Sequence, residues 1–380
     1  MLPLVVVALL VAAAVLVLLY QGAAIVLAYE MPKLDPRPRN PDDAPRPKVS
    51  VVIAARNEED QISGTLATVL AQDYSDLEIV VVEDGSTDRT RELIEAYAPR
   101  VRCVTPPPLP EGWTGKNWAC WTGASAVRGE WLVFLDADVR THPAAIRTVL
   151  DWVVEERADL ASVAPRIEAV GLWERVVLPF FVQLTLIRFR APHVNRDRSK
   201  AAMANGQFWV TRRSTYFELG GHEAIRGVVQ EDVAIARRYR EAGRRLRIAW
   251  APALALTRMY RDRHEMFEGL LKNLSGRDHD AARLTADITS VTGFYLLPLA
   301  LLPFALATDS LVLGGVGVVL YVALFGKHVA FSRSLGTPGR YGLLYPLAVG
   351  FFLVLFATGI HRHLRGRPVQ WKGRAYSARD

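Results

Sequence analysis

Two kinds of hydrophobic pattern divide the chain into apolar ends and a middle part in which short segments alternate. Residues 2–29 carry no charge over 28 positions, and a helix of about 20 apolar residues already crosses the hydrocarbon of a bilayer. A secretory signal peptide would have a basic start and a shorter apolar core before a cleavage site of small residues. We therefore expect residues 1–30 to be a retained N-terminal transmembrane anchor.

Three further apolar runs lie near the C-terminus, at 288–307, 311–325 and 341–360. Few polar residues interrupt them, so they predict two or three membrane passes over 286–361 rather than the buried helical hairpin of a soluble core. The middle run is short and rich in glycine. The basic tail over 362–380 belongs on the cytoplasmic side by the positive-inside rule. We therefore expect two runs to cross and one to lie in the interface or to re-enter.

Between these ends, short β-branched runs alternate with amphipathic stretches. A polar, proline-rich linker over 31–48 comes first. Strands are then predicted at 49–55, 77–84, 101–106 and 130–138, and helices at 58–72, 88–98 and 115–128. Each strand is apolar nearly throughout, which is typical of a parallel sheet covered by helices on both faces. Residues 49–285 are therefore expected to form one α/β domain.

Composition and charge narrow the possible partners. The net charge of +7 is concentrated in clusters at 188–200, 236–247 and 362–374. Nucleic-acid binding is one explanation, but beside membrane segments such clusters favour anionic lipid headgroups, so no nucleic-acid partner is expected. Cys103 and Cys120 are too few for a disulfide framework and have no metal-ligand spacing.

One amphipathic segment allows two interpretations. Residues 171–193 are apolar and aromatic, with cations at the ends. This pattern favours a helix lying in the membrane interface over a strand of the sheet. A buried core helix is the alternative.

Three acidic clusters follow the predicted strands, namely "RNEE" (56–59), "EDGSTD" (83–88) and "DAD" (136–138). Ligands of parallel sheets bind at the carboxyl ends of the strands. The turn after the first strand lacks the glycines of a dinucleotide-binding G-x-G-x-x-G motif, and no G-x-x-x-x-G-K-[ST] loop is present. Asp136 and Asp138 point the same way on an extended chain and repel each other unless a cation compensates them. The pattern predicts a divalent metal between these carboxylates and a diphosphate.

The ordered segments "VSVVIAARNEE", "VVVEDGSTDRT", "WLVFLDADV" and "VVQEDVAIARRYREAG" resemble those of a family 2 glycosyltransferase. The resemblance covers about 49–263. The added segments "PPPLPEGWTGKNWACWTGA", "MANGQFWVTRRSTYFELGGH" and "VQWKGRAY" are similar to the membrane-bound branch acting on lipids, such as hopene-associated, carotenoid and ceramide glycosyltransferases. The resemblance implies a nucleotide-diphospho-sugar transferase domain of GT-A type with a mostly parallel sheet, plus N- and C-terminal transmembrane helices.

The resemblance also implies roles for the acids at the strand ends. Glu83 and Asp84 would hydrogen-bond the uracil and ribose of a UDP-sugar, although many relatives carry Asp at the position of Glu83. An Asx-type turn is the alternative for this segment. Asp138 would be the direct ligand of Mn²⁺ or Mg²⁺, with Asp136 nearer the ribose. Capping of the helix that starts near Pro143 is the alternative for this pair.

A second acidic pair and two cations would complete the chemistry. In the family the pair Glu231–Asp232 contains the catalytic base, and Asp232 matches that position. A base there would take a proton from an acceptor hydroxyl while its oxygen attacks the anomeric carbon, so one displacement inverts the configuration. Arg56 and Lys116 would add positive charge near the phosphates, unless they are solvated loop cations.

The acceptor side is expected to include a set of polar and glycine positions, namely Asn205, Gly206, Gln207, Gly221, His222, Arg258 and Arg261. His222 is equally compatible with a structural role. Arg258–Arg261 occupy the place of the Q/R-x-x-R-W motif of processive synthases, but Asp262 stands where the tryptophan would be. This departure favours a single transfer.

These features predict a multi-pass hexosyltransferase of the cell (cytoplasmic) membrane, with its catalytic domain in the cytoplasm. It would move one hexose from a UDP-sugar to a lipid hydroxyl such as that of a hopanoid or carotenoid, with Mn²⁺ or Mg²⁺. A polyprenyl-phosphate glycosyltransferase is the nearest alternative, and an inactive scaffold that only binds nucleotide-sugars is another. The oligomeric state stays open.

Overall fold

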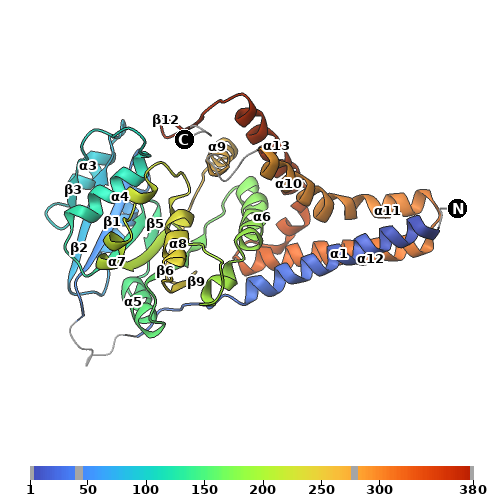
Figure 1. Ribbon diagram of the computed structural model, residues 1–380, viewed down its shortest axis with the longest axis horizontal. Coiled ribbons are helices and arrows are strands. Elements are labelled where there is room, and N and C mark those ends of the chain that lie inside the picture. Colours follow the sequence, from blue (N-terminus) through green and yellow to red (C-terminus); the bar gives the residue numbers. More distant parts are fainter. Residues whose placement is uncertain (1–3, 39–45, 275–280, 377–380) are drawn as a thin grey trace.

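Seven strands form the central sheet of the protein (Figure 1), whose computed structural model describes residues 4–38, 46–274 and 281–376. The strand order is β3-β2-β1-β4-β8-β6-β9. These strands are β1 (Val49–Ala55), β2 (Leu77–Glu83), β3 (Arg102–Val104), β4 (Trp131–Asp136), β6 (Leu160–Ala164), β8 (Phe208–Arg212) and β9 (Leu246–Trp250). All pairings are parallel except those of β8 with β4 and β6. The expected mostly parallel sheet is confirmed.

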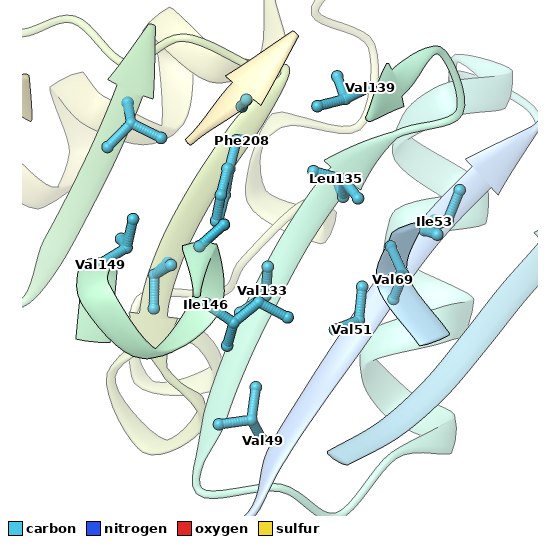
Figure 2. Packing of buried hydrophobic residues seen from close by; sticks show 14 of the residues in the cluster. Val49, Val51, Ile53, Val69, Val133, Leu135, Val139, Ile146, Val149 and Phe208 are labelled. Atoms are coloured by element: carbon cyan, nitrogen blue, oxygen red, sulfur yellow. The ribbon is translucent and has the colours of Figure 1, made fainter. Parts of the chain in front are cut away.

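Helices cover both faces of this sheet because its strands are apolar on both sides. One face packs against α2 (Ile62–Leu70), α3 (Thr90–Glu95) and α5 (Ala145–Glu155), and the other against α4 (Gly115–Ala126), α7 (Arg213–Glu218) and α8 (Glu231–Glu241). Figure 2 shows part of the first interface, with labelled side chains that include Val51, Ile53, Val69, Val133, Leu135, Ile146 and Val149. Each of these side chains is buried, and a fully buried aliphatic side chain contributes about 1.5–3 kcal/mol.

The register of the strands brings the predicted acidic clusters to one edge. Ala55 of β1 pairs with Glu83 of β2, and Ala54 pairs with Asp136 of β4. A small second sheet then adds to this edge, with the order β5-β10-β7. Its strands are β5 (Val139–Thr141), β7 (Arg166–Ile167) and β10 (Ala255–Thr257).

Three helices form an arm that projects from the α/β domain (Figure 1). They are α1 (Leu4–Tyr29), α11 (Leu297–Ala307) and α12 (Leu311–Ser334). Small and aliphatic side chains join them, among them Ala14, Val17, Leu301 and Leu320. Their outer surface exposes further large apolar side chains, among them Leu9, Leu16, Leu19, Leu306, Val319 and Val322. An apolar surface of this extent is typical of contact with lipid.

Three helices among the described residues are long and apolar enough to cross a membrane, namely Ala282–Ala307, Leu311–Ser334 and Gly339–Leu364, and α1 contains a shorter apolar stretch, Val5–Tyr20. The middle helix is longer than its predicted run because it continues through "GKHVAFSRS" to Ser334. The long helix before it includes a π-helical segment, η3 (Thr292–Leu296), between α10 (Ala281–Val291) and α11.

The last apolar helix, α13 (Tyr345–Leu364), does not join the arm. It packs instead on α10, on α6 (Leu172–Phe189) and on α9 (Arg263–Asn273), beside the α/β domain (Figure 1). α6 is therefore covered by other helices, and nine of its residues are buried. The packing of α6 agrees with a helix that is partly buried in the protein, and its position in the membrane interface stays a prediction.

After α13 the chain returns to the α/β domain. Its last two strands, β11 (Val369–Trp371) and β12 (Arg374–Tyr376), form an antiparallel hairpin. β11 lies beside α9. The hairpin therefore ends at the edge of the domain where the acidic clusters meet.

Candidate active site

One cavity of about 880 Å³ runs from the carboxyl ends of β1, β2 and β4 to the helices next to the arm. Its polar end is lined by Arg56, Glu58, Asp84, Lys116, Asp136, Asp138, Glu231, Asp232, Lys372 and Arg374. Its other end is lined by aromatic and aliphatic side chains of α1, α6, η3, α9 and α13, among them Tyr20, Phe181, Leu270, Tyr295, Phe352, Leu355 and Phe356. The cavity thus joins a charged site to an apolar one.

The carboxylates of Asp136 and Asp138 share the polar end of the cavity but differ in their partners. Oδ1 of Asp136 lies 2.8 Å from Nζ of Lys116. Oδ2 of Asp138 accepts a hydrogen bond from Oγ1 of Thr257 at 2.9 Å. Burial raises the pKa of Asp138 to about 7, and the nearby charges of Asp136 and Glu58 add to this increase. A divalent cation bound beside Asp138 would favour the charged form of this carboxylate.

This donor set fits a metal shared with a ligand. Among the residues that the structure describes, no group of three or more His, Cys, Asp or Glu side chains is arranged to hold a metal ion. Mg²⁺ is commonly held by one or two carboxylates together with substrate phosphates. Asp136 and Asp138 would therefore hold Mn²⁺ or Mg²⁺ together with the oxygens of a diphosphate.

Lys116 connects the two acidic pairs of the site. It lies in the first turn of α4, whose N-cap Thr114 accepts a hydrogen bond from the backbone N–H of Asn117. Its Nζ lies 2.8 Å from Asp136 and 2.6 Å from Oε1 of Glu231. Burial alone would lower the pKa of Lys116, but the two carboxylates raise it well above its usual range. Burial likewise would raise the pKa of Glu231, but the Lys116 ammonium lowers it. Both groups are charged at neutral pH.

Asp232 has a different environment from its neighbour. It lies in the first turn of α8, where its Oδ2 accepts a hydrogen bond from the backbone N–H of Gly206 at 2.9 Å, and its Oδ1 one from Val233 at 2.8 Å. Burial and the adjacent charge of Glu231 raise the pKa of Asp232 to about 6. A carboxylate with this pKa can accept a proton efficiently near neutral pH.

Glu83 and Asp84 are separated by the end of β2. Asp84 lines the cavity, whereas the side chain of Glu83 is only 2% exposed. Oε1 of Glu83 accepts a hydrogen bond from the backbone N–H of Ser86 at 2.5 Å, and Oε2 lies 2.7 Å from Arg91. Glu83 therefore holds the turn after β2, and its contact with a donor stays a prediction.

The predicted acceptor residues fall into two groups. Five of them line the cavity: Asn205, Gly206, Gln207, Arg258 and Arg261. Arg258 pairs with the buried Glu174 at 3.3 Å, and Arg261 pairs with Asp60.

His222 and Gly221 lie away from the cavity walls. Nδ1 of His222 lies 2.7 Å from the hydroxyl of Tyr216, and burial lowers the pKa of this histidine to about 3, so its ring is neutral. Gly221 has φ of +43°, and a Cβ there would lie 2.4 Å from the Tyr216 ring. This arrangement gives both residues a packing role, which leaves their predicted place on the acceptor side without support.

Several charged residues that line the cavity were not among the predicted site residues, and four of them lie near the acidic pairs. Glu58 belongs to "RNEE", and its acidic pattern was a usable signal. Lys272 of α9 lines the cavity, and burial lowers its pKa; a helical lysine gives no such signal in the sequence. Lys372 and Arg374 lie in the C-terminal "VQWKGRAY", whose resemblance to the membrane-bound branch was noted without a role for either residue.

Comparisons with known proteins agree with this fold. Residues 50–220 match the family model described as Glycosyl transferase family 2. The 4,4'-diaponeurosporenoate glycosyltransferase of Staphylococcus aureus (strain USA300) is 24% identical over 339 residues, which cover 87% of this chain and 88% of that protein. The solved structure titled mannosyltransferase PcManGT from Pyrobaculum calidifontis in complex with GDP-Man and Mn²⁺ has a TM-score of 0.51 and 18% identity, over 93% of this chain and 99% of that one. The fold expected for a transferase of GT-A type is confirmed.

Proposed function

We propose that the chain is a hexosyltransferase of glycosyl transferase family 2, whose model matches residues 50–220. It would transfer a single hexose from a UDP-sugar to a membrane lipid, with inversion of configuration and with Mn²⁺ or Mg²⁺. The acceptor would be a hydroxyl of a lipid of carotenoid type or similar shape. The relative named above is a 4,4'-diaponeurosporenoate glycosyltransferase by its name, which supports an acceptor of this class.

The observation that carries this proposal is the continuity of the cavity. Its polar end is lined by Asp84, Asp138 and Asp232, and its apolar end by side chains such as Tyr295 and Phe352 from helices next to the arm. A water-soluble acceptor would leave the apolar walls in contact with water, which costs about 25 cal/mol for each Å². A long apolar acceptor would cover them and still place its polar end beside the carboxylates.

The donor would occupy the polar end. Asp84 would accept hydrogen bonds from the nucleoside, and Asp136 and Asp138 would hold the metal on the diphosphate. A divalent ion bound there would neutralise the diphosphate as it leaves. Lys116 is already charged and placed between Asp136 and Glu231, so it would stabilise the same leaving group without needing to move.

Asp232 would act on the acceptor. Its backbone partners Gly206 and Val233 fix the position of the carboxylate, and its pKa of about 6 leaves it deprotonated at neutral pH. It would take the proton of the lipid hydroxyl as that oxygen bonds to the anomeric carbon and the bond to the diphosphate breaks. A single displacement of this kind inverts the anomeric centre and needs no covalent intermediate.

The residues that follow β10 support a single transfer over processive synthesis. Asp262, which stands where processive synthases have tryptophan, is the N-cap of α9 and accepts a hydrogen bond from the backbone N–H of Glu265 at 2.8 Å. A helix cap costs about 1 kcal/mol to lose. Asp262 therefore stabilises the start of helix α9.

The experiment that tests the proposal measures nucleoside diphosphate release by the purified full chain in lipid nanodiscs. Each nucleotide-sugar is supplied with Mn²⁺ or Mg²⁺, with and without an extracted lipid fraction. We expect release with a UDP-sugar that depends on both metal and lipid, together with a glycolipid of the opposite anomeric configuration. If none of the nucleotide-sugars yields a nucleoside diphosphate, the result contradicts the proposal and favours a scaffold. A product on a polyprenyl phosphate would favour that alternative acceptor.

A further inference from the structure

The C-terminal hairpin brings two basic side chains to the polar end of the cavity, where the donor would bind. The mechanism proposed above does not use them. Between β11 and β12 lie only Lys372 and Gly373, whose φ angles are 47° and 74°. Two successive residues with positive φ form the tight turn that best joins antiparallel strands. The turn and the first residue of β12 place Lys372 and Arg374 on the cavity wall.

Each of these cations is paired with an acid of the nucleotide end. The guanidinium of Arg374 makes two hydrogen bonds to Asp84, from Nη1 to Oδ2 and from Nη2 to Oδ1, the latter at 2.8 Å. The ammonium of Lys372 pairs with Glu58. In addition, Nε of Arg56 donates to the carbonyl oxygen of Lys372 at 2.9 Å. The hairpin is therefore held by the same residues that surround the predicted nucleotide.

The guanidinium of Arg374 lies against Gly115, the first residue of helix α4. A Cβ built on Gly115 would lie 1.4 Å from Nη1 of Arg374 and 2.8 Å from Oδ2 of Asp84. Only glycine leaves room for the guanidinium at this position. The next residue is Lys116, so Arg374, Lys116 and the N-terminal end of a 12-residue helix lie together beside Asp84. Helix N-termini carry partial positive charge and favour anions.

This group of positive charges matches a diphosphate. Arginine presents five N–H donors in a planar group, and Arg374 lines the same cavity as Lys116. Guanidinium groups bind phosphate oxygens in pairs of parallel hydrogen bonds. An arginine fixed on the acid that contacts the nucleoside would thus lie next to the first phosphate.

We infer that Lys372 and Arg374 are donor-binding residues, which the C-terminal hairpin supplies to hold the diphosphate of the nucleotide-sugar, and that Gly115 leaves the space in which the guanidinium of Arg374 lies. The inference rests on the proposed function and adds to it the residues that recognise the diphosphate. It also makes the segment after the membrane helices part of the donor site. Covalent chemistry is not involved.

The test compares a nucleoside diphosphate with its nucleoside on the full chain in nanodiscs. Dissociation constants for UDP and for uridine are measured by calorimetry, and by saturation-transfer NMR where binding is weak. Arg374→Ala is expected to weaken UDP binding roughly tenfold to a hundredfold, the cost of losing a hydrogen bond to a charged group, while uridine binding does not fall. Arg367→Ala is the matched control, because Arg367 is an exposed arginine of the same tail.

Gly115→Ala tests the same contact without removing a charge. The added methyl group is expected to displace Arg374 and to weaken UDP binding in the same way. In the Arg374→Ala background it is expected to have little further effect, because the side chain that it displaces is gone. Lys372→Ala is expected to weaken UDP binding to a smaller extent, since a single ammonium is lost.

Other outcomes would overturn the inference. If UDP and uridine weaken equally in Arg374→Ala, the arginine only holds the fold around Asp84. If both bind more tightly, the arginine blocks the site and does not bind the donor. If neither changes, the hairpin is irrelevant to binding. A wild-type chain that binds neither UDP nor GDP would instead contradict the proposed function, and that result is seen before any substitution is made.

Discussion

At the residue scale, the acids of the site differ in how their charge is compensated. Asp136 and Glu231 share Lys116. Asp138 has a hydroxyl partner in Thr257, and Asp232 has backbone N–H partners. Burial raises the pKa of a carboxylate whose direct hydrogen-bond partners are neutral, as for Asp138 and Asp232. This difference supports the proposal that Asp138 holds a metal and that Asp232 takes the proton.

The metal assignment predicts the behaviour of Asp138→Ala. Removing this carboxylate is expected to lower metal-dependent turnover on the order of a thousandfold, since a metal contributes several kcal/mol to the transition state. The fold should survive because a buried, poorly compensated charge has been removed. Initial rates measured against Mn²⁺ concentration test the first point and thermal melting tests the second. A variant that keeps its activity, and loses it to a chelator, would show that the metal lies elsewhere.

The base assignment predicts both a rate and a pH profile. Asp232→Asn keeps the shape but cannot accept a proton, so transfer to a hydroxyl acceptor is expected to fall by roughly 10²–10⁴-fold, with donor binding retained. In the wild type at saturating metal, kcat/KM should rise with pH up to about 6, the pKa of Asp232, and then level off, because a base with a raised pKa is protonated and inactive below it.

The rate of Asp232→Asn and the pH profile test the same proton transfer. The acidic limb of the profile should be absent in Asp232→Asn, whose residual activity does not depend on this proton. Near-normal turnover on a hydroxyl acceptor, or an unchanged acidic limb, would remove Asp232 from the mechanism.

At the element scale, the apolar helices differ in what they pack against. α1, α11 and α12 pack together and expose apolar side chains outward. α13 packs on α6, α9 and α10 and leads into the hairpin that contacts Asp84. An arm of three crossings would place the α11–α12 turn and the hairpin on opposite sides of the bilayer. This arrangement agrees with the cytoplasmic tail expected from its basic residues.

Cysteine labelling tests this arrangement. A membrane-impermeant maleimide is expected to label Asp309→Cys, in the α11–α12 turn, from outside intact cells. Arg367→Cys, in the tail, should be labelled only after the cells are opened. The wild type, with Cys103 and Cys120, gives the background. Labelling of the tail from outside intact cells would place α13 across the membrane and overturn the arrangement.

At the scale of the whole molecule, the α/β domain and the apolar helices line one cavity together. Neither part contains it alone, because its polar end lies at the strand ends and its apolar end lies between α6, α10 and α13. The lipid acceptor would enter from the side of the helices. A substitution at the apolar end can therefore block the path of the acceptor to the carboxylates without changing the polar end, where the donor would bind.

Ser290→Trp tests the path of the acceptor. Ser290 and Thr289 of α10 are both exposed, but only Ser290 is part of the cavity lining. Filling the cavity at Ser290 is expected to lower transfer to lipid by roughly tenfold or more, since overpacking costs about 1–3 kcal/mol. Slow hydrolysis of the donor and its KM should stay unchanged. Thr289→Trp is the control, and equal loss in both variants would contradict the path.

The sequence alone determined the features that depend on near neighbours along the chain. The apolar strands and their carboxyl-terminal acids followed from the spacing of side chains, and the parallel sheet followed from the alternation of strands and helices. Asp136 and Asp138 were predicted to share one site because residues two apart on a strand face the same way. The apolar ends of the chain were equally evident, since the length of a run without charge decides whether it can cross a bilayer.

The tertiary structure decided which side chains reach the cavity and which distant segments meet there. Glu83 and Asp84 are adjacent in sequence, yet packing against Arg91 turns one away and leaves the other on the cavity wall. His222 is held by Tyr216 within the core. Arg374 reaches Asp84 across 290 positions, through a hairpin placed by α13. Local periodicity carries no information about such contacts, because they depend on how complete elements pack in three dimensions.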